Sequence, residues 1–437
     1  MANVFSRLFY GWYVVAAAFA LLFFTGATQA VIGVMIKPMS AEFGWSRSAT
    51  TSAIFLNMAV YAVSVIVTGR LYDRYGPKWV IAGSTLLFSL GFALMATMDS
   101  LWTFFLFYGL IAATGLGGIT IPMFGSIVGK WFEARRGSVI SLAFAGYCVG
   151  QFILIPIYSD LILTAGWRVA CLWIAGLCGV VGLVVALGVV RGDPDRFGLR
   201  PYGSGEPQAK LSEIEPSPAA RARAVRTRDL TLAEAMRTRS LWLYTIVMFV
   251  CGGGDHLVST HLVPMVTDYG ISADIAADML AWLGLLSLAG ILLAGPAVDA
   301  IGNKLPIAIT FVVRVALFVM VLAVKGTVSF WIYATVFGVT LLITAVLTPT
   351  LVSALYGVTH IGFISGFITT VHMLGSGSWS YLGGVIFDKT GDYDLAFIIS
   401  AGLAALAVLC TLFIREERHE PPSGTSAALV SPARPAG

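Results

Sequence analysis

The chain has 437 residues, of which 58% are hydrophobic and only 11% are charged, and its formal net charge is +4. A soluble domain carries roughly 25% charged residues, so most of this chain must face lipid or other apolar helices. The composition excludes an ordinary soluble domain. The small positive charge gives no support to nucleic-acid binding, because membrane topology explains where the basic residues lie.

Twelve apolar stretches follow one another along the chain, each close to the roughly 20 residues that a helix needs to cross a bilayer. They are 11–36, 47–69, 79–97, 101–129, 138–160, 168–190, 241–264, 275–298, 305–323, 327–351, 361–384 and 394–414. The long polar segment 191–240 divides them six and six. This pattern predicts an all-α membrane protein with twelve transmembrane helices in two pseudo-symmetric six-helix bundles. The bundles comprise residues 1–190 and 241–414, with a cytoplasmic linker at 191–240 and a cytoplasmic tail at 415–437.

Most Lys and Arg residues lie at one end of the predicted helices and in the linker. Because cytoplasmic loops are enriched in basic residues, both termini are predicted to be cytoplasmic, in a multi-pass protein of the bacterial inner (plasma) membrane. The first apolar stretch is too long for a cleaved signal peptide. All five cysteines fall within predicted helices, where they are expected to pack as small apolar side chains. We therefore expect a monomer in the lipid bilayer with no metal site and no cofactor.

A charged turn occurs twice in the chain, 226 positions apart. The residues that keep their spacing are Gly69, Asp73, Gly76 and Lys78 in the first copy and Gly295, Asp299, Gly302 and Lys304 in the second. Nearly the same offset relates three further pairs: Gly150 and Gly375, Tyr147 and His372, and Gln29 and Asp255. Such a repeat indicates duplication, and duplicated membrane bundles are mostly transporters.

The first copy of this turn is expected to act as a latch between the two halves. Its glycines permit close helix approach, and Asp73 can accept hydrogen bonds from Arg70, Arg74 or a neighbouring helix start. Rocking between outward- and inward-open states would break such contacts. A solvated turn that only sets topology also fits. The candidate gating residues are Gly69, Arg70, Asp73, Arg74, Gly76, Lys78 and Asp299.

With these motifs, the whole chain resembles the major facilitator superfamily, whose loop between the second and third helices carries the pattern of the first turn. A closer likeness is to the monocarboxylate transporter and oxalate–formate antiporter group. It rests on Tyr10-Gly11-Trp12, the segment 131–137, Asp193-Pro194 with the segment 198–201, and the segment 387–393. The resemblance implies that the first, fourth, seventh and tenth helices line a central path. The anion-binding arginine of the eighth helix and lysine of the eleventh helix, typical of this group, are both missing here.

Ionisable residues within predicted helices are the best pointers to function, because a charge at mid-bilayer costs about 2.5–3.5 kcal/mol even on insertion scales. By the resemblance, Asp255 and His256 lie near the substrate, where they could exchange protons during the transport cycle. Alternatively, they form a hydrogen-bonded structural pair beside a broken Gly252-Gly253-Gly254 stretch. His261 lies nearer the outer end, where water can reach it.

Two further charged or titratable residues fall at the middle of predicted helices. Arg314 cannot be discharged in a protein, so it either binds an anionic substrate or forms a structural ion pair with Asp255 or Asp278. His372 either lines the cavity or joins helices by hydrogen bonding. The candidate substrate-binding residues are Gln29, Tyr147, Gln151, His256, His372 and Arg314, and the candidate proton-coupling residues are Asp255 and His256.

These observations predict a secondary active transporter that works by alternating access. The expected substrate is a small, monocarboxylate-like organic acid, with protons as the coupling ion, as in a symporter. No phosphate-cradling loop and no clustered catalytic residues occur, so the chain is predicted not to be an enzyme. The alternatives are an efflux transporter for amphipathic or neutral small molecules and a membrane sensor that binds without translocating.

Overall fold

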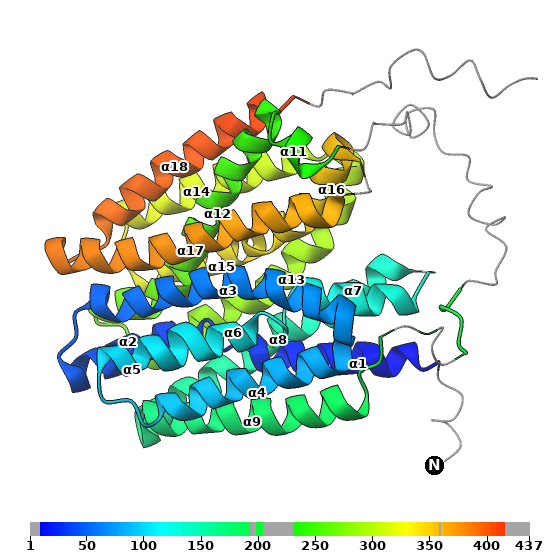
Figure 1. The fold of residues 1–437 in the computed structure, drawn as a ribbon. Coiled ribbons are helices and arrows are strands. Elements are labelled where there is room, and N and C mark those ends of the chain that lie inside the picture. Colours follow the sequence, from blue (N-terminus) through cyan, green and yellow to red (C-terminus); the bar gives the residue numbers. More distant parts are fainter. Residues whose placement is uncertain are drawn as a thin grey trace, which may run out of the picture.

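The computed structural model describes residues 9–133, 135–192, 194, 198–203, 230–357 and 360–415, without the side chains of residues 136, 299 and 361. The described residues form a bundle of long helices and no β-strand (Figure 1). An isolated bridge joins Phe132 to Tyr202. The predicted all-α membrane fold is confirmed.

The N-terminal half consists of six membrane-crossing segments, two of which are interrupted. Its elements are α1 Gly11–Gly26, α2 Val31–Phe43, α3 Arg47–Tyr75, α4 Pro77–Met95, α5 Leu101–Phe104, the π-helical η2 Phe105–Ala112, α6 Ala113–Leu116, α7 Ile121–Trp131, α8 Arg136–Ala165 and α9 Trp167–Gly188. Together α1 and α2 make one span, and α5 to α7 make another. The second interruption begins at Gly117 and Gly118; Thr120 then caps α7, with Pro122 in its first turn.

The C-terminal half also has six long segments, but only one of them, Thr327–Tyr356, is interrupted. Its elements are α11 Leu232–Ala235, α12 Arg239–Asp268, α13 Ala273–Ile301, α14 Lys304–Ala323, α15 Thr327–Leu341, α16 Ile343–Tyr356, α17 Ile361–Thr390 and α18 Asp394–Phe413. In the described part of the chain, 11 helical segments are long and apolar enough to cross a membrane. The remaining predicted stretch, 361–384, forms α17, whose 30 residues include many glycines and serines. These small residues reduce its hydropathy but allow close packing against α3 and α12.

Equivalent glycines hold equivalent helix pairs together in the two halves. A Cβ on Gly150 of α8 would overlap the carbonyl oxygen of Phe23 in α1. Gly375 of α17 lies in the same way against the carbonyl of Phe249 in α12. Because the glycines and the carbonyls are separated by nearly the repeat offset, the sequence duplication is also a duplication of helix contacts.

The two halves meet through α3 with α17, α8 with α13, and α2 with α12 (Figure 1). Gly377 of α17 lies against Phe55 and Met58 of α3, and Gly284 of α13 lies against the side chain of Gln151. These small residues bring the backbones of opposite halves close together, as expected where two bundles must move past one another.

The contrast between two glycines of α17 gives a test of this packing. Gly375→Ala should lower the free energy of unfolding by about 1–3 kcal/mol, because its Cβ would press on backbone rather than on a flexible side chain. Gly366→Ala is the matched control, since no atom lies within 4 Å of the position its Cβ would take. Thermal unfolding of both variants in detergent measures the difference; equal melting temperatures would contradict the packing argument.

Candidate functional site

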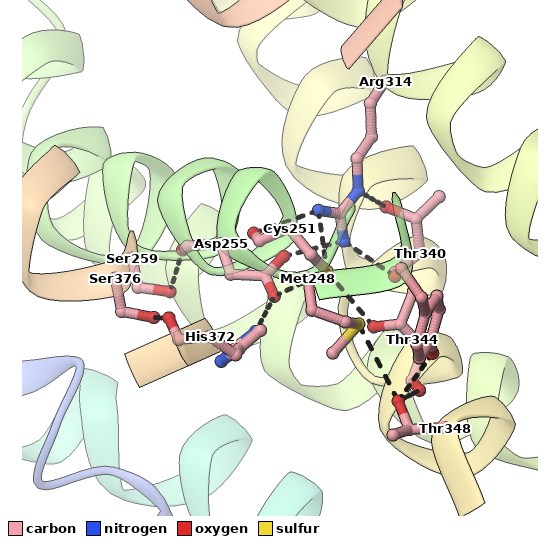
Figure 2. Close-up of polar contacts among 11 residues, drawn as sticks. Met248, Cys251, Asp255, Ser259, Arg314, Thr340, Thr344, Thr348, His372 and Ser376 are labelled. Carbon is pink, nitrogen blue, oxygen red and sulfur yellow. Dashed lines mark hydrogen bonds and ion pairs between the residues drawn. The ribbon is translucent and has the colours of Figure 1, made fainter. Parts of the chain in front are cut away.

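A buried ion pair lies at the centre of the C-terminal half. Nη2 of Arg314, from α14, lies 2.7 Å from Oδ1 of Asp255, from α12 (Figure 2). The side chain of Arg314 is 1% exposed and that of Asp255 is 9% exposed. The contact is ionic rather than a well-aligned hydrogen bond, because Oδ1 accepts no hydrogen bond of good geometry from the described residues. Of the two partners that the sequence offered for Arg314, the structure selects Asp255.

Every nitrogen of the Arg314 guanidinium has a protein partner. Nε donates to Oγ1 of Thr340 at 3.2 Å, Nη2 donates to the Thr340 carbonyl at 2.9 Å, and Nη1 donates to the Cys251 carbonyl at 3.4 Å. The ring of Phe337 lies 4.6 Å from the guanidinium carbon. Arg314 is therefore fixed within its own half, and in this state it has no donor free for a substrate carboxylate.

The second oxygen of Asp255 faces a histidine. Nε2 of His372, from α17, lies 3.2 Å from Oδ2, and the thiol of Cys251 lies 3.5 Å from the same oxygen. Figure 2 shows Arg314 and His372 reaching the carboxylate from opposite sides. The His372 side chain is 15% exposed, more than either member of the ion pair. Asp255 thus connects a permanent cation to a titratable group.

The three glycines before Asp255 give the neighbouring helices room to approach. A Cβ on Gly252 would overlap the backbone carbonyl of His372, and one on Gly254 would lie 3.5 Å from Nη1 of Arg314. The helix break expected at this stretch is wrong, because α12 runs without interruption from Arg239 to Asp268. The glycines provide close packing here rather than a break.

The remaining predicted site residues lie in three different places. His256 is half-buried within electrostatic range of Asp255 and His372, and its Nδ1 has no hydrogen-bond partner among the described residues. Tyr147 of α8 is also half-buried and lies within electrostatic range of Asp255. Gln29 is half-buried in the turn between α1 and α2, whereas Gln151 is fully buried against Gly284. Tyr147 and His256 therefore lie within electrostatic range of the ion pair, whereas Gln151 lies in the contact between the halves.

Sequence reasoning missed Cys251 and Thr340. Cys251 precedes Asp255 by four residues, so helical spacing could have indicated that the two share a face. Nothing in the sequence connects Thr340 to Arg314. Ligand-type atoms of Cys251, Asp255 and His372 lie within 4.8 Å of one another. A metal ion there would have to displace or tolerate Arg314, which contacts both Cys251 and Asp255, so the donor set does not suit a cation.

The predicted inner latch is not formed in this state. Arg70 and Asp73 are exposed, and the structure gives Asp73 no hydrogen bond or ion pair with any described residue. Arg74 and Lys78 stack over their chain neighbours Tyr75 and Trp79. The expected close helix approach at Gly69 is also missing, since no atom lies within 4 Å of its would-be Cβ, whereas Gly76 ends α3 with a φ of 80°. The side chain of Asp299 lies outside the described part.

The halves are instead fastened at the opposite end, which the basic-residue pattern predicts to face outward. Arg47 of α3 pairs with Asp268 of α12 at 2.7 Å, and Lys37 of α2 pairs with the same carboxylate at 2.6 Å. The backbone N–H groups of Arg47 and Ser48 donate to the Asp388 carboxylate of α17 at 3.0 and 2.8 Å. We call Lys37, Arg47, Asp268 and Asp388 the outer lock. With this lock closed and the latch apart, the structure is closed on the predicted outer side.

Known proteins resemble this chain along most of its length. The model of the Major Facilitator Superfamily matches residues 18–263 and 244–436. Monocarboxylate transporter 11 of Homo sapiens is 25% identical over 411 residues, covering 90% of this chain and 80% of the human protein. The oxalate:formate antiporter of Oxalobacter formigenes is 23% identical over 269 residues, covering 62% of this chain and 58% of that protein.

Solved structures agree on the fold. The crystal structure of a D-xylose-proton symporter superposes with a TM-score of 0.68 at 16% identity, covering 92% of this chain and 97% of that one. At this identity the likeness concerns the fold alone. Because the family model matches nearly the whole chain in two segments, the chain belongs to the Major Facilitator Superfamily, and it is a membrane transporter rather than an enzyme.

Proposed function

We propose that this transporter moves a small organic acid by alternating access and couples its movement to protons at the Asp255–Arg314–His372 centre. The observation that carries the proposal is the charge composition of this centre. It holds one permanent cation, one carboxylate paired with it at 2.7 Å, and one histidine on the other carboxylate oxygen. The sensor and efflux alternatives remain as outcomes of the test.

The proton is assigned to His372 rather than to Asp255 or His256. Arg314 stays charged in any protein environment, so a neutral Asp255 would leave it buried without compensation, at high cost. The pair therefore keeps a constant net charge of zero through the cycle. His372 has the more exposed side chain, and histidine is the residue type whose ordinary pKa lies closest to neutrality. Asp255 acts as a positioning residue that orients the imidazole and stabilises its protonated form.

The substrate class follows from the charge of the centre. With His372 neutral the centre has no net charge, and with His372 protonated it carries one positive charge. A monoanion would compensate that charge, so the acid and the proton would be bound and released together. Tyr147 and His256, both half-buried and close to Asp255, would supply polar contacts that orient the anion. The named activities of the monocarboxylate and oxalate:formate relatives are consistent with this class.

The same proposal includes the orientation of the protein in the membrane and its oligomeric state. The end that carries the linker and the exposed Arg70 and Asp73 faces the cytoplasm, and the outer lock faces the opposite side. Both termini are then cytoplasmic, in the inner membrane of a bacterium. The substrate pathway lies between the two halves of a single chain, so a monomer suffices.

Transport by purified protein in proteoliposomes tests the function directly. Pyruvate, lactate and formate are offered with an imposed pH gradient, with oxalate as a dianion and xylose and uridine as neutral comparators. A 1:1 proton symporter accumulates its substrate up to about tenfold across one pH unit. Saturable binding without flux would favour the sensor. Movement of the neutral compounds in place of the acids would overturn the substrate class and favour efflux.

The assignment of the proton to His372 predicts the loss of both accumulation and exchange of the acid. His372→Gln should abolish accumulation driven by the pH gradient, because the glutamine cannot change charge. It should also weaken exchange of the acid at equal pH, because the glutamine cannot supply the positive charge that the monoanion compensates. His360→Gln, at the N-terminal end of the same helix, is the control and should accumulate substrate as the unmodified protein does. Wild-type accumulation by His372→Gln would show that the proton is carried elsewhere.

The positioning role of Asp255 predicts that substitutions of Asp255 and Arg314 have strongly non-additive effects on the free energy of unfolding. Asp255→Asn should cost about 3–5 kcal/mol of unfolding free energy because it strands a buried arginine, and Arg314→Met in the same chain should recover much of that loss. Asp394→Asn breaks the partly exposed pair with Lys325 and should cost no more than about 1 kcal/mol. Thermal unfolding followed by tryptophan fluorescence measures all of them. Additive losses in the double variant would contradict a direct pair.

A further inference from the structure

A buried histidine connects the outer lock to the middle of α17. Nη1 of Arg47 donates to the hydroxyl of Tyr393 at 2.7 Å, and this hydroxyl lies 3.0 Å from Nδ1 of His261 in α12. Nε2 of His261 lies 2.8 Å from the backbone carbonyl of Ser380 in α17. The sequence placed His261 where water can reach it, but the residue is only 2% exposed. It is therefore a buried residue attached to the lock through Tyr393 and not a surface histidine.

The hydrogen bonds of this chain of groups have only one consistent direction. A carbonyl oxygen can only accept, so Nε2 of His261 must carry a hydrogen. In a neutral ring Nδ1 is then an acceptor, and it takes the hydroxyl hydrogen of Tyr393. The Tyr393 oxygen in turn accepts from Arg47. Each donor has an acceptor only while His261 is neutral.

We propose that His261 is a proton-binding site whose protonation opens the outer lock. A proton on Nδ1 would turn this nitrogen into a donor facing the Tyr393 oxygen, which already accepts from Arg47. The hydroxyl hydrogen of Tyr393 would then lose its acceptor. A buried donor without an acceptor is costly, and the closed lock would have to break to satisfy it.

The charges around His261 also favour opening of the outer lock when His261 is protonated. The lock brings Lys37 from α2 and Arg47 from α3 against Asp268 from α12 and Asp388 from α17, so its four charges already balance. A protonated His261 adds an unbalanced positive charge within electrostatic range of Arg47 and Asp388. The ring is also closely packed, because the would-be Cβ of Gly383 lies 2.7 Å from Nε2 and the residue is only 2% exposed. The open state, in which water reaches the ring, therefore binds the proton more tightly than the closed state.

This inference does not rest on the central site. It assigns a second proton-binding group, on the outer side, that sets the balance between closed and open states before any substrate binds. Acid outside would open the outer lock, and alkali would close it. A single proton changes the closed-to-open ratio by at most about tenfold per pH unit.

Distances between spin labels across the lock test the proposal. The labels are placed through Ala41→Cys on α2 and Lys389→Cys on α17, both at exposed positions, while the five native cysteines are buried. Double electron–electron resonance is recorded from pH 8 to 5.5, above the usual carboxylate pKa of about 4. The short-distance, closed population should fall as the pH falls. A distribution that does not change over this range would overturn the proposal without any variant.

Three variants identify the responsible group. His261→Gln can still accept from Tyr393 and donate to Ser380, so it should stay closed at every pH. Tyr393→Phe removes the hydroxyl and should lower the closed population already at pH 8. His372→Gln should keep the full pH response. The outer proton site is refuted if His261→Gln responds to pH as the unmodified protein does, or if His372→Gln abolishes the response. The proposal for the central site is tested separately, by the transport measurements.

Discussion

The C-terminal half is organised around the need to neutralise one arginine. Arg314 is fully buried, and its charge cannot be removed, so the surrounding helices must supply every contact that water would otherwise provide. Asp255 from α12 supplies the opposite charge, and Thr340 from α15 and the Cys251 carbonyl supply acceptors. The relative positions of α12, α14 and α15 are therefore fixed by one guanidinium. His372 on α17 is attached to this rigid group and is the part that can change charge.

The two halves share their packing but differ in their chemistry. Gly150 against Phe23 and Gly375 against Phe249 repeat one helix contact at nearly the same offset. At the positions equivalent to Asp255 and His372, however, the N-terminal half carries Gln29 and Tyr147. Both are polar and neither changes charge near neutrality. The duplicated scaffold thus has one half specialised for holding charge and one half that presents a neutral face to it.

The sequence alone predicts the helices and the duplication well, because both depend on local hydropathy and on spacing along one chain. It also singles out Asp255, Arg314 and His372, since ionisable residues are rare within membrane helices. It could not choose between Asp255 and Asp278 for Arg314, because spacing carries no information about which distant helices pack together. The glycines before Asp255 suggested a break for a related reason: close contact with α14 and α17 is a tertiary property that composition does not reveal.

The contact between Asp388 and the start of α3 has a consequence for how the halves separate. Asp388 accepts from the first two N–H groups of a helix that belongs to the other half, while Ser46 satisfies the next two. Part of the N-cap of α3 is therefore supplied by the C-terminal half of the same chain. When the halves move apart, that helix end must exchange a carboxylate for water and loses a favourable charge at the positive end of its dipole. The stability of the first turn of α3 is thus tied to the conformational state, and backbone amide protection at Arg47 and Ser48 becomes an intrinsic reporter of it.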